Sequence, residues 1–275
     1  MTAEWLPNMI TILQIVVLIY IIVRSARLIR ESTNPLLPVF FTFAMASFLL
    51  SDLYWIAYDL IRPDTRMPFA ANEMGECACF LLLAASLSAV LNNDRETSES
   101  SGMPSGIHTA FKEVIFTAFF VAMNIALWIA WTGEWLQDII AGAALGYLLC
   151  TVARGLKQTG AFQRKEWLMM GGACTLLVVM QVLTFFTHDG LYTVLDTLCY
   201  VLMFTVEAYF IIRCISLLRR PQKPAAEFCL ALSALGWSLV TMYMSSGVFY
   251  YIGLLVNIIL LPILLLSFMR EVRSV

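Results

Sequence analysis

Nine long apolar runs limit the fold of this chain more than any other feature. A helix needs about 20 mainly apolar residues to cross the hydrocarbon core of a bilayer, and the runs are of about this length. In lipid no water is present to bond the backbone N–H and C=O groups, so they must form hydrogen bonds with one another, and each run should be helical. The sequence therefore predicts an all-α, polytopic membrane bundle of about nine transmembrane helices, forming a single transmembrane domain over residues 1–275. The runs lie near residues 5–26, 36–61, 68–91, 111–131, 137–156, 167–186, 191–217, 226–246 and 249–270.

A count of eight helices is the alternative, because only Ser245, Ser246 and Gly247 separate the last two runs. Lys and Arg concentrate in the inner loops of membrane proteins, so their positions test the count. With nine helices and the N-terminus outside, every Lys and Arg except Arg62 and Arg66 falls on the inner side. This favours nine helices with the N-terminus outside and the C-terminus inside. No Asn-x-Ser/Thr motif occurs, which favours the bacterial cytoplasmic membrane.

The longest connection, residues 92–110, is poor in apolar residues and rich in Ser, Glu and Gly. A segment of this composition cannot bury enough apolar surface to offset the entropy lost when it becomes ordered. We predict a flexible cytoplasmic loop here and assign it no function.

Several chemistries lack the residues they need. The net charge is −2 and the basic residues are scattered, so no nucleic-acid partner is expected. His108 and His188 are the only histidines and lie in loops on opposite sides, which excludes a three-histidine zinc site and a buried Ser-His relay. Cys77 and Cys79 would point to different faces of a helix. We predict no metal, no cofactor and no catalytic residue.

Acidic residues inside the runs are the most informative polar groups, because a charge near the bilayer centre costs about 2.5–3.5 kcal/mol on insertion scales. Asp52 and Asp59 are seven residues apart and share one helix face, and Glu73 and Glu76 follow in the next run. At a rise of 1.5 Å per residue, Asp52 and Glu76 both lie about 12–14 Å from the outer boundary. A short turn makes the two runs neighbours, so these carboxylates could share one helical hairpin.

Other polar groups fall in the outer half of their runs, and no Lys or Arg does. The negative charge of the carboxylates would therefore be neutralised by Arg62 or Arg66 at the rim, by a shared proton or by a bound cation. The ring of Trp55 could contact a bound cation through a cation-π interaction. The sequence predicts an outward-facing acidic cavity for a small cation or protons. The predicted binding residues are Asp52, Glu76, Asp59, Glu73, Asp196, Asn124, Asn257 and Trp55.

Simpler interpretations stand beside this one. The aromatic residues fit an interfacial belt, and Asp59 lies close enough to the boundary to be solvated. Asp52 and Glu76 could be protonated and hydrogen-bonded for packing. Gly142 and Gly146 form a small-xxx-small pair, for which packing within the chain is favoured over a homodimer contact.

Three classes of function remain. We favour a small transporter that binds a cation or protonated amine in the acidic cavity and exchanges it for protons. The first alternative is a membrane sensor or accessory subunit that works with a separate cytoplasmic protein, since no output domain is present. The second, ranked last, is a membrane-embedded lipid-modifying enzyme that uses an acidic pair as acid and base.

Overall fold

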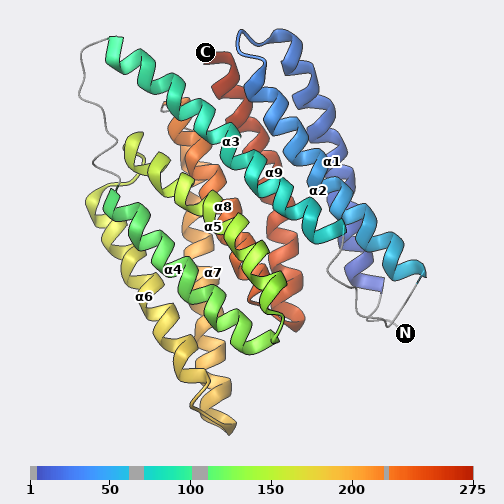
Figure 1. The fold of residues 1–275 in the computed structure, drawn as a ribbon, viewed down its shortest axis with the longest axis vertical. Coiled ribbons are helices and arrows are strands. Elements are labelled where there is room, and N and C mark those ends of the chain that lie inside the picture. The colour runs from blue at the N-terminus through green and yellow to red at the C-terminus, as the bar shows by residue number, and fades with distance from the viewer. Residues whose placement is uncertain (1–4, 62–70, 101–110, 220–222, 275) are drawn as a thin grey trace.

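The computed structural model describes residues 5–61, 71–100, 111–219 and 223–274, and these residues form nine α-helices and no strands. Each helix contains a stretch long and apolar enough to cross a bilayer, so the predicted all-α membrane bundle is confirmed. Figure 1 shows the helices packed side by side in one elongated bundle. Their bounds are α1 (Trp5–Glu31), α2 (Leu36–Ile61), α3 (Ala71–Ser100), α4 (Phe111–Thr132), α5 (Trp135–Gln158), α6 (Arg164–Thr184), α7 (Asp189–Arg219), α8 (Pro224–Tyr243) and α9 (Gly247–Ser274).

The helices follow the predicted runs closely, with one extension. Helix α3 continues to Ser100, so residues 92–100, which we predicted as the start of a flexible loop, are helical. Once the apolar part of a helix has formed, each further residue adds a hydrogen bond without a new nucleation cost. Residues 101–110 of the predicted loop lie outside the described residues, as do Arg62 and Arg66.

Helix α8 forms the centre of the bundle. Every residue from Ala225 to Met242 is buried, which requires neighbours on all sides of the helix. These neighbours are α3, α5, α7 and α9. In the core, the Phe228 ring lies 5.5 Å from the Phe268 ring of α9 and 6.3 Å from the Phe41 ring of α2. The other helices are arranged around α8, with α1 and α2 on one side and α4 and α6 on the other (Figure 1).

Helix α4 lies at the edge of the bundle, where it packs mainly against α5 and α6. All residues of α4 are described, and Phe120 alone is buried. On α5, a Cβ atom added to Gly142 would lie 2.5 Å from the Ile125 side chain, and one added to Gly146 would lie 2.5 Å from Val121. The small-xxx-small pair therefore serves close packing of α5 on α4 within the chain. A homodimer through the same pair stays a prediction.

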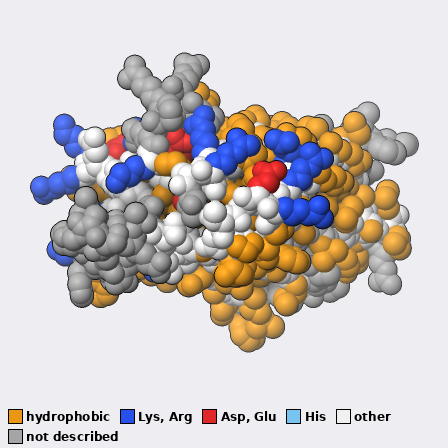
Figure 2. Space-filling model, turned by 90° about the horizontal axis from the view of Figure 1, so that it is seen from above, with side chains coloured by type: hydrophobic (Ala, Val, Ile, Leu, Met, Phe, Trp, Pro, Cys, Tyr) orange, Lys and Arg blue, Asp and Glu red, His pale blue; other side chains and the backbone are white. Residues whose placement is uncertain are grey.

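The basic side chains gather at one end of the bundle. Figure 2 looks onto the end that holds the C-terminus and shows Lys and Arg side chains clustered there, with hydrophobic side chains around them. The positive-inside rule makes this the inner end. The turns between α4 and α5, α6 and α7, and α8 and α9 then lie at the outer end.

We expect Gly146→Ala to lower the free energy of unfolding by about 1–3 kcal/mol, because the added methyl group pushes Val121 out of its packed position. Gly172→Ala on α6 is the matched control, since nothing lies within 4 Å of a Cβ atom there. Thermal unfolding of the purified protein in detergent measures both. Equal losses of stability in the two variants would contradict the close packing of α4 on α5.

Candidate functional site

Asp52 lies in the interior of the bundle, 8% exposed, at the middle of α2. Its carboxylate accepts a hydrogen bond of 2.9 Å from the amide of Gln14 on α1, which is itself buried. A lone Gln inside an apolar run is costly unless it bonds to another helix. Gln14 was not among the predicted site residues, and its isolation in an otherwise apolar run is the signal that identifies it.

Glu76 lies opposite Asp52, across the contact between α2 and α3. It accepts hydrogen bonds from the hydroxyl of Ser51, at 3.3 Å, and from the hydroxyl of Tyr243 on α8. Ser51 precedes Asp52 in the chain, so its bond to Glu76 brings the two carboxylates to the same part of the contact between α2 and α3. Gly75 permits this approach, because a Cβ atom there would lie 2.9 Å from the carbonyl oxygen of Ser47. The predicted pairing of Asp52 and Glu76 on one hairpin is therefore present.

Two further carboxylates extend the same group toward the outer end. Asp59 accepts a 2.7 Å hydrogen bond from the amide of Asn8 on α1. Glu73 accepts one of 3.0 Å from the amide of Gln137 on α5. Each of the four acids is thus bonded to a neutral side chain from another helix. We call the residues Asp52, Asp59, Glu73 and Glu76 with their partners Asn8, Gln14, Ser51, Gln137 and Tyr243 the carboxylate network.

The remaining predicted residues occupy different places. Trp55 is 40% exposed on the outside of α2. Asn257 is fully buried, and its amide donates to the sulfur of Met242 at 3.5 Å. Asn124 donates to the carbonyl oxygen of Phe120 one turn earlier in its own helix. Asp196 lies in a cavity on the far side of α8, apart from the carboxylate network.

This outer cavity, of about 240 Å³, lies between the outer ends of α4, α6 and α7 and the turn from α8 to α9. Asp196 is the carboxylate in its described walls, and four of the other lining residues are Trp or Tyr. The side-chain oxygen of Gln181 is buried without a hydrogen-bond partner among the described residues. Trp131 and Tyr192 are 59% and 43% exposed, so the cavity reaches the surface. Its lining residues are Leu127, Trp128, Trp131, Gln181, Thr184, Phe185, Tyr192, Asp196, Tyr200, Met244 and Ser246.

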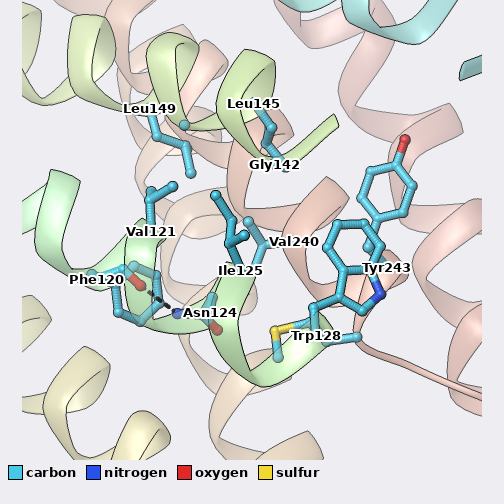
Figure 3. A pocket seen from close by; sticks show the side chains of 12 residues that line it. Phe120, Val121, Asn124, Ile125, Trp128, Gly142, Leu145, Leu149, Val240 and Tyr243 are labelled. Atoms are coloured by element: carbon cyan, nitrogen blue, oxygen red, sulfur yellow. Dashed lines mark hydrogen bonds between the residues drawn. The ribbon is translucent and has the colours of Figure 1, made fainter. Parts of the chain in front are cut away.

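One aromatic pair connects the outer cavity to the carboxylate network. The ring of Trp128, in the cavity wall, lies 5.4 Å from the ring of Tyr243, whose hydroxyl donates to Glu76. Figure 3 shows the two rings side by side, with the Tyr243 hydroxyl directed away from Trp128. A change in the position of Trp128 would therefore reach Glu76 through a single side chain.

Three ion pairs tie the helices together at the inner end. Lys157 pairs with Glu113 at 2.6 Å, Arg213 with Glu166 at 3.1 Å, and Arg270 with Glu227 at 2.8 Å. Each pair joins the two arms of one hairpin, namely α4–α5, α6–α7 and α8–α9, at the end opposite its turn. These pairs were not predicted from the sequence, although each acid lies in the first turn of a helix that starts at the inner end. There a Glu also compensates the helix dipole.

The buried Glu207 on α7 takes no part in these pairs. It is 1% exposed and lies beside the buried hydroxyl of Ser238 on α8. Arg213, the nearest cation along the helix, is bonded instead to Glu166 and to the carbonyl oxygen of Ala161.

Comparison with known proteins gives no family assignment: no protein-family model matches the chain, and neither a curated protein nor a solved structure shows significant similarity to it. Among the described residues, no group of three or more His, Cys, Asp or Glu side chains could hold a metal ion. The geometry of the carboxylate network and of the outer cavity is therefore the basis for inferring a function.

We expect Glu227→Gln and Arg270→Gln each to lower the stability, with a coupling of about 1–3 kcal/mol in a double-mutant cycle, because Glu227 is only 2% exposed. Arg273→Gln, at the exposed end of the same helix, is the control and should change little. Thermal unfolding of the four proteins measures the cycle. If the losses of stability caused by the two substitutions simply add in the double variant, Glu227 and Arg270 do not interact, and the ion pair is contradicted.

Proposed function

We propose that this multi-pass membrane protein is a small transporter that binds an organic cation or protonated amine in the outer cavity and exchanges it for protons through the carboxylate network. The observation that carries the proposal is the combination of one carboxylate, Asp196, with four aromatic residues in a cavity that reaches the outer surface. The proposal places the cation at Asp196, whereas the sequence analysis centred the acidic cavity on Asp52 and Glu76.

The chemistry of the cavity suits an organic cation better than a metal ion. A metal ion needs several oxygen, nitrogen or sulfur ligands at short distance, whereas an ammonium group is held well by aromatic faces and one negative charge. Trp128, Trp131, Tyr192 and Tyr200 supply such faces around Asp196. Gln181 also lines the cavity, where its amide nitrogen donates to the sulfur of Met244 at 3.4 Å.

The carboxylate network is suited to binding and releasing the protons that are exchanged for the cation. Asp52 and Glu76 lie in the membrane-spanning part of the bundle, are brought near one another by Ser51, and accept their hydrogen bonds from neutral groups. Two neighbouring carboxyl groups in such surroundings favour holding a proton between them. The Trp128–Tyr243 pair is the route by which an occupied cavity can influence Glu76.

The ion pairs at the inner end support an outward-facing arrangement. They hold the arms of three hairpins together on the inside, while the outer cavity lies open at the other end of the same helices. An exchange cycle requires the two ends to open in turn. Separation of the inner ion pairs is the change that would open the inner end.

We expect Asp196→Asn to weaken the binding of tetramethylammonium by about tenfold or more, because it removes the charge that faces the ligand. Asp189→Asn, an exposed residue at the start of the same helix, is the matched control. Binding is measured by equilibrium dialysis with the radiolabelled probe. Transport is measured as uptake of the same probe into proteoliposomes that are acidic inside.

The outcomes separate the classes of function. Uptake by the parent and the control but not by Asp196→Asn supports a transporter. Binding that depends on Asp196 without any uptake would contradict transport and favour the sensor or accessory subunit. Equal binding in all three proteins would contradict a cation site at Asp196.

We expect Tyr243→Phe to leave the binding of tetramethylammonium within about twofold of the parent, since the lost hydroxyl faces Glu76 rather than the outer cavity. The same variant should lose the uptake driven by a proton gradient. Tyr251→Phe on α9 serves as the control. Unchanged gradient-driven uptake in Tyr243→Phe would contradict coupling through Tyr243.

A further inference from the structure

A narrow slot of about 40 Å³ adjoins the outer cavity at Trp128. It lies on the face of α4 that packs against α5, and Trp128 and Met244 line both spaces. The slot lies where α4 crosses α5 at Gly142 and Gly146, beside the tight contacts that these glycines make with Ile125 and Val121. Figure 3 shows Val121, Ile125 and Leu149 around it.

A third cavity, of about 90 Å³, follows in the same direction. It shares Phe120 and Leu149 with the slot and is lined mostly by apolar and aromatic residues between α4, α5, α6, α7 and α8. The three cavities together accompany α4 from Trp131 to Phe116. At 1.5 Å per residue, this is a path of about 22 Å.

The two ends of this path differ in chemistry. The outer end has a carboxylate and four aromatic residues, whereas the slot and the third cavity are lined mostly by apolar residues. A ligand that fits both must carry a positive charge at one end and an aliphatic chain at the other. The slot is narrow, so a single chain fits it better than the two chains of a bilayer phospholipid.

We propose that the substrate is a single-chain cationic amphiphile, with its ammonium head at Asp196 and its aliphatic tail in the slot along α4. This inference rests on the proposed function, because the head occupies the same cation site. Asn124 is the polar side chain midway along the slot. Its nitrogen donates to the carbonyl oxygen of Phe120, and its buried oxygen has no hydrogen-bond partner among the described residues.

The test uses alkyltrimethylammonium ions with methyl, butyl and octyl chains as probes, and the ligand-dependent rise in unfolding temperature of the protein in lipid nanodiscs as the readout. Affinity should rise with chain length by up to about fourfold for each methylene group that enters the slot. Asn124→Trp fills the slot and should abolish this rise while leaving the methyl probe unaffected. Ala122→Trp, exposed on the opposite side of α4, is the matched control, and Asn124→Leu keeps the volume and should keep the rise.

The pattern across variants separates the two proposals. A chain-length effect in the parent, Ala122→Trp and Asn124→Leu but not in Asn124→Trp supports the amphiphile. Binding that depends on Asp196 but not on chain length overturns the tail site and leaves the cation site intact. A chain-length effect equal in all variants reflects partition into the lipid and overturns the tail site as well. Binding that Asp196→Asn does not change overturns the cation site, and the amphiphile with it.

Discussion

The structure depends on the rule that a polar group within the membrane must find its partner inside the protein. Asp52 is bonded to Gln14 from α1, Glu76 to Tyr243 from α8, and Glu73 to Gln137 from α5. Because each partner comes from a different helix, these bonds fix how α1, α2, α3, α5 and α8 are placed around one another. The same rule makes the network a candidate for holding protons, since Asp52 and Glu73 are buried and Asp52 and Glu76 accept hydrogen bonds from neutral donors.

The candidate ligand site lies beside a helix at the edge of the bundle. Helix α8 is buried on every side, whereas α4 has one buried residue and lies over two glycines of α5. The space between them widens at the outer end into the cavity at Asp196. The carboxylate network and the outer cavity therefore lie in different parts of the bundle, and Tyr243 of α8 links them by bonding to Glu76 and packing against Trp128 in the cavity wall.

Much of this arrangement could be predicted from the sequence. The nine helices follow directly from the apolar runs, and the depth of Asp52 and Glu76 predicts their meeting on one hairpin. The cavity at Asp196 was harder to predict from the sequence. Asp196 was among the predicted residues, but nothing in the spacing shows that α4, α6 and α7 meet around it, because contacts between distant helices depend on side-chain packing. The neutral partners Gln14 and Gln137 were missed for the same reason, and the inner ion pairs were missed although Glu recurs in the first turn of α4, α6 and α8.

The central claim is that the cation binds at Asp196 and not within the carboxylate network. The most direct test is a crystal of the protein grown with tetramethylarsonium, which has the shape of tetramethylammonium and an anomalous scatterer at its centre. The account predicts an anomalous peak enclosed by Asp196, Trp128 and Tyr192. A peak beside Asp52 and Glu76, or no peak at a concentration that saturates binding in solution, would contradict it.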